Sequence, residues 1–219
     1  PDRCTPPLGW AGPVMKGWRE HKGLATALNI ENVDTDQLIP ARFMSTPRCE
    51  GYGAFLLHDM RFDAEGGADP DFPINRHPDV SILVARRNFG SGSSREAAVY
   101  ALADFGIRAV IAPSFGDIFA SNSVNNGLLP ALVSEAHSQQ LLDMLGTGTV
   151  ELTVNIETRT IRVGIKSIPF TLSEAWSQKL INGWDDIDLT QQHRPAITAY
   201  RARRAKTLPW IIPKVENVE

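Results

Sequence analysis

Residues 80–114, VSILVARRNFGSGSSREAAVYALADFGIRAVIAPS, decide the fold. The run VSILVARRNF is continuously apolar and ends in charge, which is typical of a buried parallel strand. The segment SSREAAVYALADFG has helical spacing, with Ala98 and Leu102 on one face and Gly106 as its stop. The run IRAVIAPS predicts a second buried strand. This order of strand, helix and strand indicates a parallel sheet covered by helices.

The flanking sequence extends this pattern in both directions. Upstream, GLATALNI predicts a strand and ENVDTD a turn, whereas residues 45–79 form a long irregular stretch with one helical turn near AFLLHDMRF. Downstream, FGDIFASNSVNNGLLP predicts a short helix and a turn, and SEAHSQQLLDMLG a further helix. The alternating run TVELTVNIETRTIRVGIKSIPFTLS predicts a hairpin that turns at ETRT. Two closing helices follow, with Ser173 and Asp186 as N-caps.

The length, net charge and apolar runs of the chain limit the class of protein. A chain of 219 residues predicts one domain, which we place at residues 21–219 behind an extended N-terminal segment, residues 1–20. The net charge of −3 gives no electrostatic support for nucleic acid as a partner. No apolar run of about 18 residues predicts a membrane span, and the N-terminus lacks the apolar centre of a secretory signal.

The cysteine content points to a reduced, cytoplasmic setting. Cys4 and Cys49 are too few for a disulfide framework, and too few to hold an iron–sulfur cluster by themselves. His58, His77 and His137 are scattered without the spacing of metal ligands. We therefore expect this chain to bind no metal.

The GSGSS turn between the first strand and its helix has two possible explanations. Serine is an ordinary N-cap residue, so the stretch could simply begin a helix. Alternatively, Gly90 and Gly92 allow a close backbone approach, and free N–H groups at the helix N-terminus attract a carboxylate or phosphate. The spacing is not that of a dinucleotide fingerprint, because Arg95 stands at the third glycine position, and neither a Walker loop nor a nucleophile elbow fits. On these residues alone the two explanations are equally good.

Three longer motifs favour the anion site. The chain contains three long motifs in succession: NVDTDQLIPARFM at residues 32–44, NFGSGSSREAAVYAL at 88–102 and VIAPSFGDIFASNSVNNGLLP at 110–130. In these stretches the sequence resembles the small subunits of 3-isopropylmalate dehydratase (isopropylmalate isomerase), which belong to the aconitase superfamily. Weaker similarity extends over nearly the whole chain from about residue 20.

The resemblance implies an α/β fold: the swivelling β/β/α domain of the aconitase type, with a mixed, mostly parallel sheet flanked by helices. It also implies a large partner subunit that carries a [4Fe-4S] cluster, while this chain closes over a small dicarboxylate substrate. The expected reaction is the interconversion of 3-isopropylmalate and 2-isopropylmalate through 2-isopropylmaleate, in leucine biosynthesis. By the same resemblance Ser93 is the general base, acting as an alkoxide.

Further site residues follow from the matched motifs. Ser94 and Arg95 would bind substrate carboxylate oxygens, with the amides around Gly90 and Gly92 completing the anion loop. Asp36 would line the same pocket, and Arg42 would be a second cationic contact. For Asp34 we expect a turn role instead, through an Asx-type hydrogen bond. Asn122, Asn125 and Asn126 are expected to satisfy backbone groups around a tight turn.

The sequence departs from the family pattern at several positions. Ala97 stands where the family commonly has histidine, and Ser91 lies between the two glycines in place of cysteine or threonine. Residues 45–53 lie where the family discriminates the side group of its substrate. A related diacid hydratase, acting on maleate, citraconate or a methylated malate, therefore stays an alternative. So does a non-catalytic binding module, which would be expected to lose the Ser-Ser-Arg trio.

Overall fold

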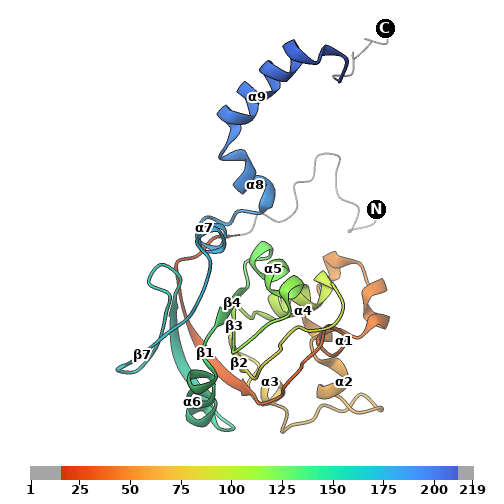
Figure 1. The fold of residues 1–219 in the computed structure, drawn as a ribbon. Helices are drawn as coiled ribbons and strands as arrows, with labels where there is room; N and C mark the ends of the chain where they lie inside the picture. Colours follow the sequence, from red (N-terminus) through yellow and green to blue (C-terminus); the bar gives the residue numbers. More distant parts are fainter. Residues whose placement is uncertain (1–15, 212–219) are drawn as a thin grey trace. The chain divides into compact units, whose positions relative to one another are not determined.

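The structure of the chain is a computed structural model that describes residues 16–211 (Figure 1). Most of the expected N-terminal segment 1–20, including Cys4, lies outside the described residues. The chain divides into two compact units, one running to Trp184 and the other beginning at Asp185. The assignment of residues 21–219 to a single domain stays a prediction.

The first unit alternates strands and helices as the sequence predicts. Its elements are β1 (Glu20–Leu28), α1 (Thr35–Leu38), η1 (Ala41–Ser45), η2 (Arg48–Glu50), η3 (Gly53–Phe55), α2 (His58–Arg61), α3 (Pro73–Arg76), β2 (Ile82–Ala85), α4 (Glu96–Phe105), β3 (Ala109–Ala112), α5 (Asp117–Asn125), β4 (Leu129–Leu132), α6 (Glu135–Leu145), β5 (Thr149–Asn155), β6 (Thr160–Val163), β7 (Lys166–Pro169) and α7 (Glu174–Asn182), where η denotes a 3-10 helix.

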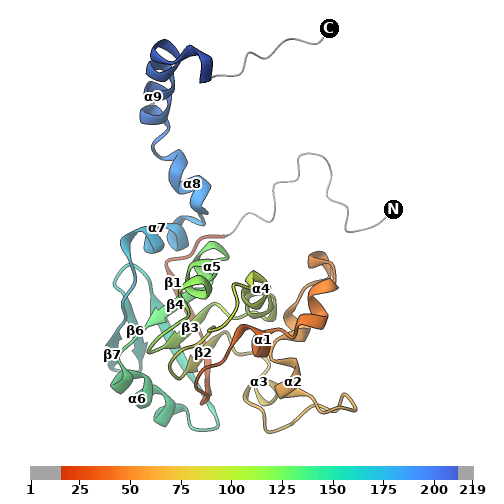
Figure 2. The same ribbon diagram turned by 45° about the vertical axis from the view of Figure 1, so that its right-hand side comes forward.

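The strands form one seven-stranded mixed sheet in the order β4-β3-β2-β1-β5-β6-β7. Neighbours among β1 to β4 pair in parallel, whereas β1 with β5, β5 with β6 and β6 with β7 pair in antiparallel (Figures 1 and 2). The expected mixed sheet flanked by helices is confirmed. Because β1 to β4 run in one direction, the loops that follow them emerge at the same edge of the sheet.

The central strands are buried on both faces. In β2, Leu83 and Ala85 belong to one hydrophobic core, and Ile82 and Val84 belong to the other. This alternation follows from the two-residue period of a strand. The first core contains the buried apolar residues of α4 and of the segment from α1 to α3, and the second contains those of α6 and of the β5–β7 meander. Both views place α6 and the α1–α4 group on opposite sides of the sheet (Figures 1 and 2).

Three local predictions differ from the structure. Leu129 and Pro130, expected as part of a turn, instead begin strand β4, whose backbone pairs in parallel with β3. The expected hairpin gains a third strand, β7. Ser173 caps α7 as predicted, by accepting the Trp176 N–H at 3.2 Å. The last cap lies one residue earlier than expected, at Asp185, whose carboxylate accepts two backbone N–H bonds.

The second unit consists of α8 (Asp186–Gln191), α9 (Arg194–Thr207) and η4 (Pro209–Ile211). The sequence predicts two closing helices, but the structure has three, with α7 in the first unit and α8 and α9 in the second. No residue of α8 or α9 is buried. Across residues 16–211, no helix is long and apolar enough to cross a membrane.

Candidate functional site

The serine-rich turn lies where three loops meet at the carboxyl edge of the parallel strands. The loop after β1 pairs with the loop after β2, with the Gly90 N–H bonded to the Val33 carbonyl at 2.7 Å. The loop after β2 in turn pairs with the loop after β3, through the Phe89 N–H and the Ser114 carbonyl at 3.1 Å. These loops contain parts of the three motifs recognised in the sequence. Parallel strands therefore bring together segments that are far apart in the chain.

Gly90 is required by the packing of this junction. Its φ of 72° lies in the left-handed region, and a Cβ at this position would approach the Phe119 ring to 2.2 Å. Phe119 belongs to α5 and is buried. The loop after β2 therefore lies directly against α5, at a distance that only glycine permits. The close approach at Gly90 is to an aromatic ring, and the expected role of Gly90 in an anion loop stays a prediction.

The serines do not cap helix α4, contrary to the first explanation of the turn. The N-cap residue is Arg95, with no side-chain cap hydrogen bond, and the helix begins at Glu96. Ser93 and Ser94 precede it and are exposed. The carbonyl of Ser93 accepts the Arg95 N–H at 2.8 Å, which tightens the chain just before the helix. The two hydroxyls are therefore presented at the surface, not used in capping.

Several backbone N–H groups of the turn have no acceptor among the described residues. Within the described part of the chain, the N–H groups of Gly92, Ser93 and Ser94 donate to no backbone or side-chain acceptor. Gly92 has a φ of 94°, in the region that glycine adopts more readily than other residues. Exposed N–H groups directly ahead of a helix N-terminus suit an anion, since the helix dipole adds its positive end.

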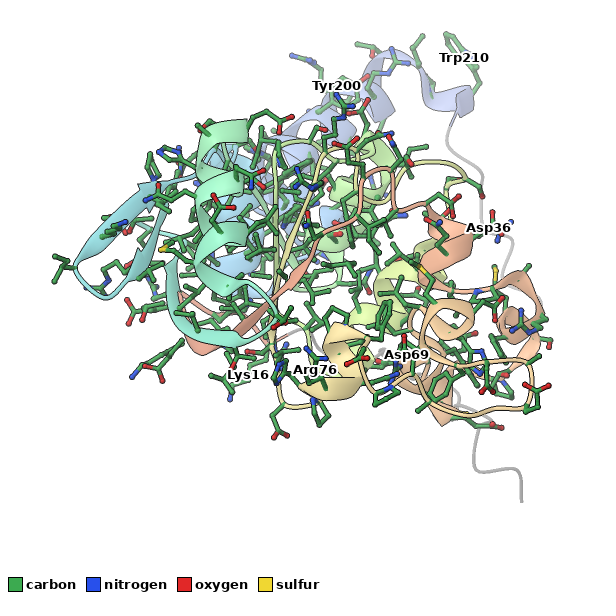
Figure 3. The ribbon with its side chains drawn as sticks, turned by 90° about the horizontal axis from the view of Figure 1, so that it is seen from below. Lys16, Asp36, Asp69, Arg76, Tyr200 and Trp210 are labelled. Atoms are coloured by element: carbon green, nitrogen blue, oxygen red, sulfur yellow. The ribbon has the colours of Figure 1, made fainter. Side chains whose placement is uncertain are left out.

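Arg95 and Asp36 lie together as expected. The Arg95 guanidinium forms an ion pair with the Asp36 carboxylate. The Arg95 side chain is 23% exposed, and Asp36, labelled on α1 in Figure 3, is 56% exposed. Asp36 therefore holds the guanidinium beside the serine turn, with a face still open to solvent.

Arg42 lies in a different cluster. Its guanidinium binds the Asp59 carboxylate through two nitrogens, one at 2.8 Å, and lies over the Phe43 ring with 4.5 Å between the guanidinium carbon and the ring centroid. The hydrogen bond from Arg42 lowers the pKa of Asp59 to about 2. His58 joins the pair, with its Nδ1 3.2 Å from an Asp59 oxygen. Arg42, His58 and Asp59 line a hollow of about 330 Å³ that does not include the serine turn.

Two hydrogen bonds near the turn are not predicted by any local pattern in the sequence. Thr35, between the two aspartates of the DTD motif, is buried, and its hydroxyl donates to the Ser93 carbonyl at 3.0 Å. Asn126, expected to serve a tight turn, bonds the Asn122 carbonyl and also reaches Glu96 in the first turn of α4, at 2.9 Å. Neither contact has a local sequence signal, because each joins residues at least 30 positions apart.

Asp34 has the turn role expected of it. Its carboxylate accepts the Gln37 N–H at 2.7 Å, and the Gln37 side chain accepts the Asp34 N–H, which together form a capping box at α1. Ala97 is buried at 8% exposure in the first core. The position at which this sequence departs from the family's histidine therefore lies on the buried face of α4.

Metal-binding side chains are not gathered in the described structure. Across residues 16–211, no group of three or more His, Cys, Asp or Glu side chains is placed to hold a metal ion. The residues present therefore do not fit an iron–sulfur cluster, and the site as built is one of hydroxyl, amide and guanidinium groups.

Comparison with known proteins gives a consistent result. The model of the aconitase C-terminal domain family matches residues 15–136. The 3-isopropylmalate dehydratase small subunit of Shewanella denitrificans is 46% identical over 195 residues, which cover 86% of this chain and 96% of that protein. Its counterpart in Shewanella amazonensis is 44% identical, over 86% and 97% of the two chains.

The likeness extends to a solved structure. The crystal structure of 3-isopropylmalate dehydratase (leuD) from Methanocaldococcus jannaschii superposes with a TM-score of 0.60 and 27% sequence identity. The match covers 83% of this chain and 99% of that one. The fold described above and the sequence relatives therefore agree.

Proposed function

We infer the function from one premise: the chain belongs to the aconitase C-terminal domain family, among the small subunits of 3-isopropylmalate dehydratase. It is a hydro-lyase subunit that works with a large subunit in leucine biosynthesis. We propose that the complex interconverts 3-isopropylmalate and 2-isopropylmalate through 2-isopropylmaleate. Water leaves the substrate in the first half of this reaction and returns at the neighbouring carbon in the second.

The proposed base is Ser93. Its hydroxyl is exposed at the turn, and the N–H groups of Gly92 and Ser94 beside it have no protein acceptor among residues 16–211. A serine hydroxyl is a very weak acid, so its anion needs strong local stabilisation. Backbone donors, the N-terminus of α4 and the Arg95 charge are the groups that can supply it. As the alkoxide, Ser93 would take the proton from the carbon next to a substrate carboxylate and return it on rehydration.

Ser94 and Arg95 form the proposed carboxylate clamp. The Ser94 hydroxyl is exposed, and the partly open Arg95 guanidinium offers donors that match a carboxylate with two hydrogen bonds. Asp36 would keep the guanidinium oriented before the substrate arrives. Arg42 is the second cationic contact of this proposal. Because Arg42 lies with Asp59 and His58 in a hollow that the serine turn does not line, we expect Arg42 to contribute less than Arg95.

The [4Fe-4S] cluster is assigned to the large subunit in this proposal. The described residues of this chain hold no suitable group of ligands, and family membership supports a partner that carries the cluster. The contribution of this chain is limited to binding the carboxylates and moving the proton. The side group of the diacid substrate is the finer part of this proposal. Because Ala97 departs from the family pattern, a maleate, citraconate or methylmalate hydratase is the alternative function.

The test is reconstitution with the matching large subunit and its cluster. Formation of the unsaturated diacid from 3-isopropylmalate would be followed by ultraviolet absorbance, beside a panel of maleate, citraconate and methylmalate. Ser93→Ala is expected to lower kcat by at least about 100-fold, since general-base contributions reach 10²–10⁴. Ser167→Ala, at an exposed serine of β7, is the matched control and should leave kcat unchanged.

Two results would contradict the proposal. A Ser93→Ala enzyme within about tenfold of the wild-type rate would remove the base assignment. A wild-type complex that turns over another diacid of the panel and not 3-isopropylmalate would replace the substrate.

A further inference from the structure

We propose that Thr35 is the positioning residue of the serine turn: its hydroxyl fixes the Ser93 carbonyl, and through it aims the backbone donors that receive the substrate anion. This inference rests on the proposed function of Ser93. Thr35 itself touches no substrate, because its side chain is 1% exposed.

Thr35 is bonded to the turn at two successive points. Its backbone N–H donates to the Ser91 carbonyl at 2.9 Å, and its hydroxyl donates to the Ser93 carbonyl at 3.0 Å. A Cβ built on Gly92 would lie 3.7 Å from the Thr35 hydroxyl oxygen, so the turn lies in contact with this side chain. The next residue, Asp36, pairs with Arg95. The start of α1 therefore contacts every second residue of the turn, at 91, 93 and 95.

The direction of the free amides follows from these bonds. The C=O and N–H of one trans peptide point in opposite directions, and no described peptide bond is cis. Since the Ser91 and Ser93 carbonyls point at Thr35, the N–H groups of Gly92 and Ser94 must point away from it. These N–H groups lack an acceptor in the described structure. Thr35 thus turns two donors of the proposed anion site toward the open side of the turn.

The hydroxyl is the specific element of this arrangement. Within residues 16–211, the other donor to the Ser93 carbonyl is the neighbouring Arg95 N–H, at 2.8 Å, which belongs to the turn itself. Among the described residues, the bond from Thr35 is the one that ties that carbonyl to a separate element, α1. The Thr35 hydroxyl is buried and donates to a backbone carbonyl 58 positions away in another loop. The need to hold that loop in place explains this arrangement.

The experiment compares four variants in the reconstituted complex with its large subunit and cluster. Thr35→Val removes the hydroxyl and keeps the branched shape, while Thr35→Ser keeps the hydroxyl. We expect Thr35→Val to lower kcat and raise the KM for 3-isopropylmalate, with kcat/KM at least about tenfold down, because small misplacements of reacting groups are costly. Thr35→Ser should recover most of this loss.

A matched control comes from β1. Thr26 is also 1% exposed, and its hydroxyl donates to the Gly148 carbonyl at 3.3 Å, in a part of the sheet that pairs with β5. Thr26→Val removes the same kind of bond away from the turn. It should match Thr35→Val in its change of thermal stability and leave kcat and KM unchanged.

Several outcomes would overturn the inference. Equal kinetics of Thr35→Val and Thr26→Val would show that the Thr35 hydroxyl positions nothing. Equal losses in Thr35→Val and Thr35→Ser would show that the hydroxyl is not the relevant group. If Thr35→Val does not assemble, Thr35→Ala replaces it, and equal activity of the Ala and Ser variants overturns the inference. Ser93→Ala in the same assay separates the two proposals. Full activity of Ser93→Ala refutes the assignment of Ser93 as the base. An inactive Ser93→Ala enzyme beside a fully active Thr35→Val enzyme refutes only the positioning role of Thr35.

Discussion

At the residue scale, the pairing of Arg95 with Asp36 shows how charge is arranged at the turn. The pair is partly exposed, so solvent screens it and its own contribution to stability is small. Its value lies in orientation, because a guanidinium held at one edge keeps its remaining donors aimed outward. Arg42 is held in the same manner by Asp59, within its own cluster.

Arg95→Lys tests the clamp. Lysine keeps the charge and loses the forked geometry, so we expect the KM for 3-isopropylmalate to rise by at least about tenfold, equivalent to about 1.4 kcal/mol of binding. Steady-state kinetics of the reconstituted complex would measure this change.

The control for that variant is Arg162→Lys on β6, at an exposed ion pair with Glu20. Its KM should equal that of the wild type. An unchanged KM in Arg95→Lys as well would show that the guanidinium does not bind the carboxylate.

At the element scale, the site depends on three loops held in register. β2, β3 and β4 are short and almost entirely buried. The loops after β1, β2 and β3 continue the pairing as isolated bridges, Asp34 with Ser91 and Phe89 with Phe115. A rigid sheet edge thus extends into the loops that carry the polar groups. The tight approach of Gly90 to α5 is part of this extension.

Gly90→Ala is expected to destabilise the fold. The new Cβ meets the Phe119 ring and adopts a left-handed φ, so we expect a loss of about 2–4 kcal/mol in the free energy of unfolding. Chemical denaturation would measure it.

Gly164→Ala separates the two causes. Gly164 also has a positive φ, of 55°, but its Cβ would enter open space. This variant should lose only about 1–2 kcal/mol. Equal losses in the two variants would contradict the close packing of Gly90 against α5.

At the scale of the whole molecule, the two units differ in how they are built. The first contains both hydrophobic cores, whereas α8 and α9 contain no buried residue. Five of the fourteen residues of α9 are arginine or lysine, and none is acidic. An isolated helix of this length and charge has little stability of its own.

Ending the chain at Trp184 should leave the first unit folded. We expect the Tm of the shortened chain to lie within about 2 °C of that of the full chain, because no apolar core is removed. Circular dichroism during heating would test this. A fall of about 10 °C or more, or loss of the folded signal, would show that α8 and α9 belong to the fold's stable core.

The sequence by itself determined the strand–helix–strand order of residues 80–114, the helix stop at Gly106 and the segments that carry the chemistry. These features follow from short-range patterns: apolar runs, helical spacing and glycine positions. The strand-to-helix turn with its serines could be predicted in this way. Family resemblance then supplied the roles that periodicity alone cannot give.

Only the tertiary structure decided which groups meet. In the structure, α4 begins at Glu96, after the serines. Arg95 pairs with Asp36, and Arg42 pairs with Asp59. The structure also places the Thr35 hydroxyl on the Ser93 carbonyl. The physical reason is that these contacts depend on the register of parallel strands whose loops lie side by side in space although they are dozens of residues apart in sequence. Local patterns fix where a strand ends, and the packing of the sheet fixes what stands opposite that end.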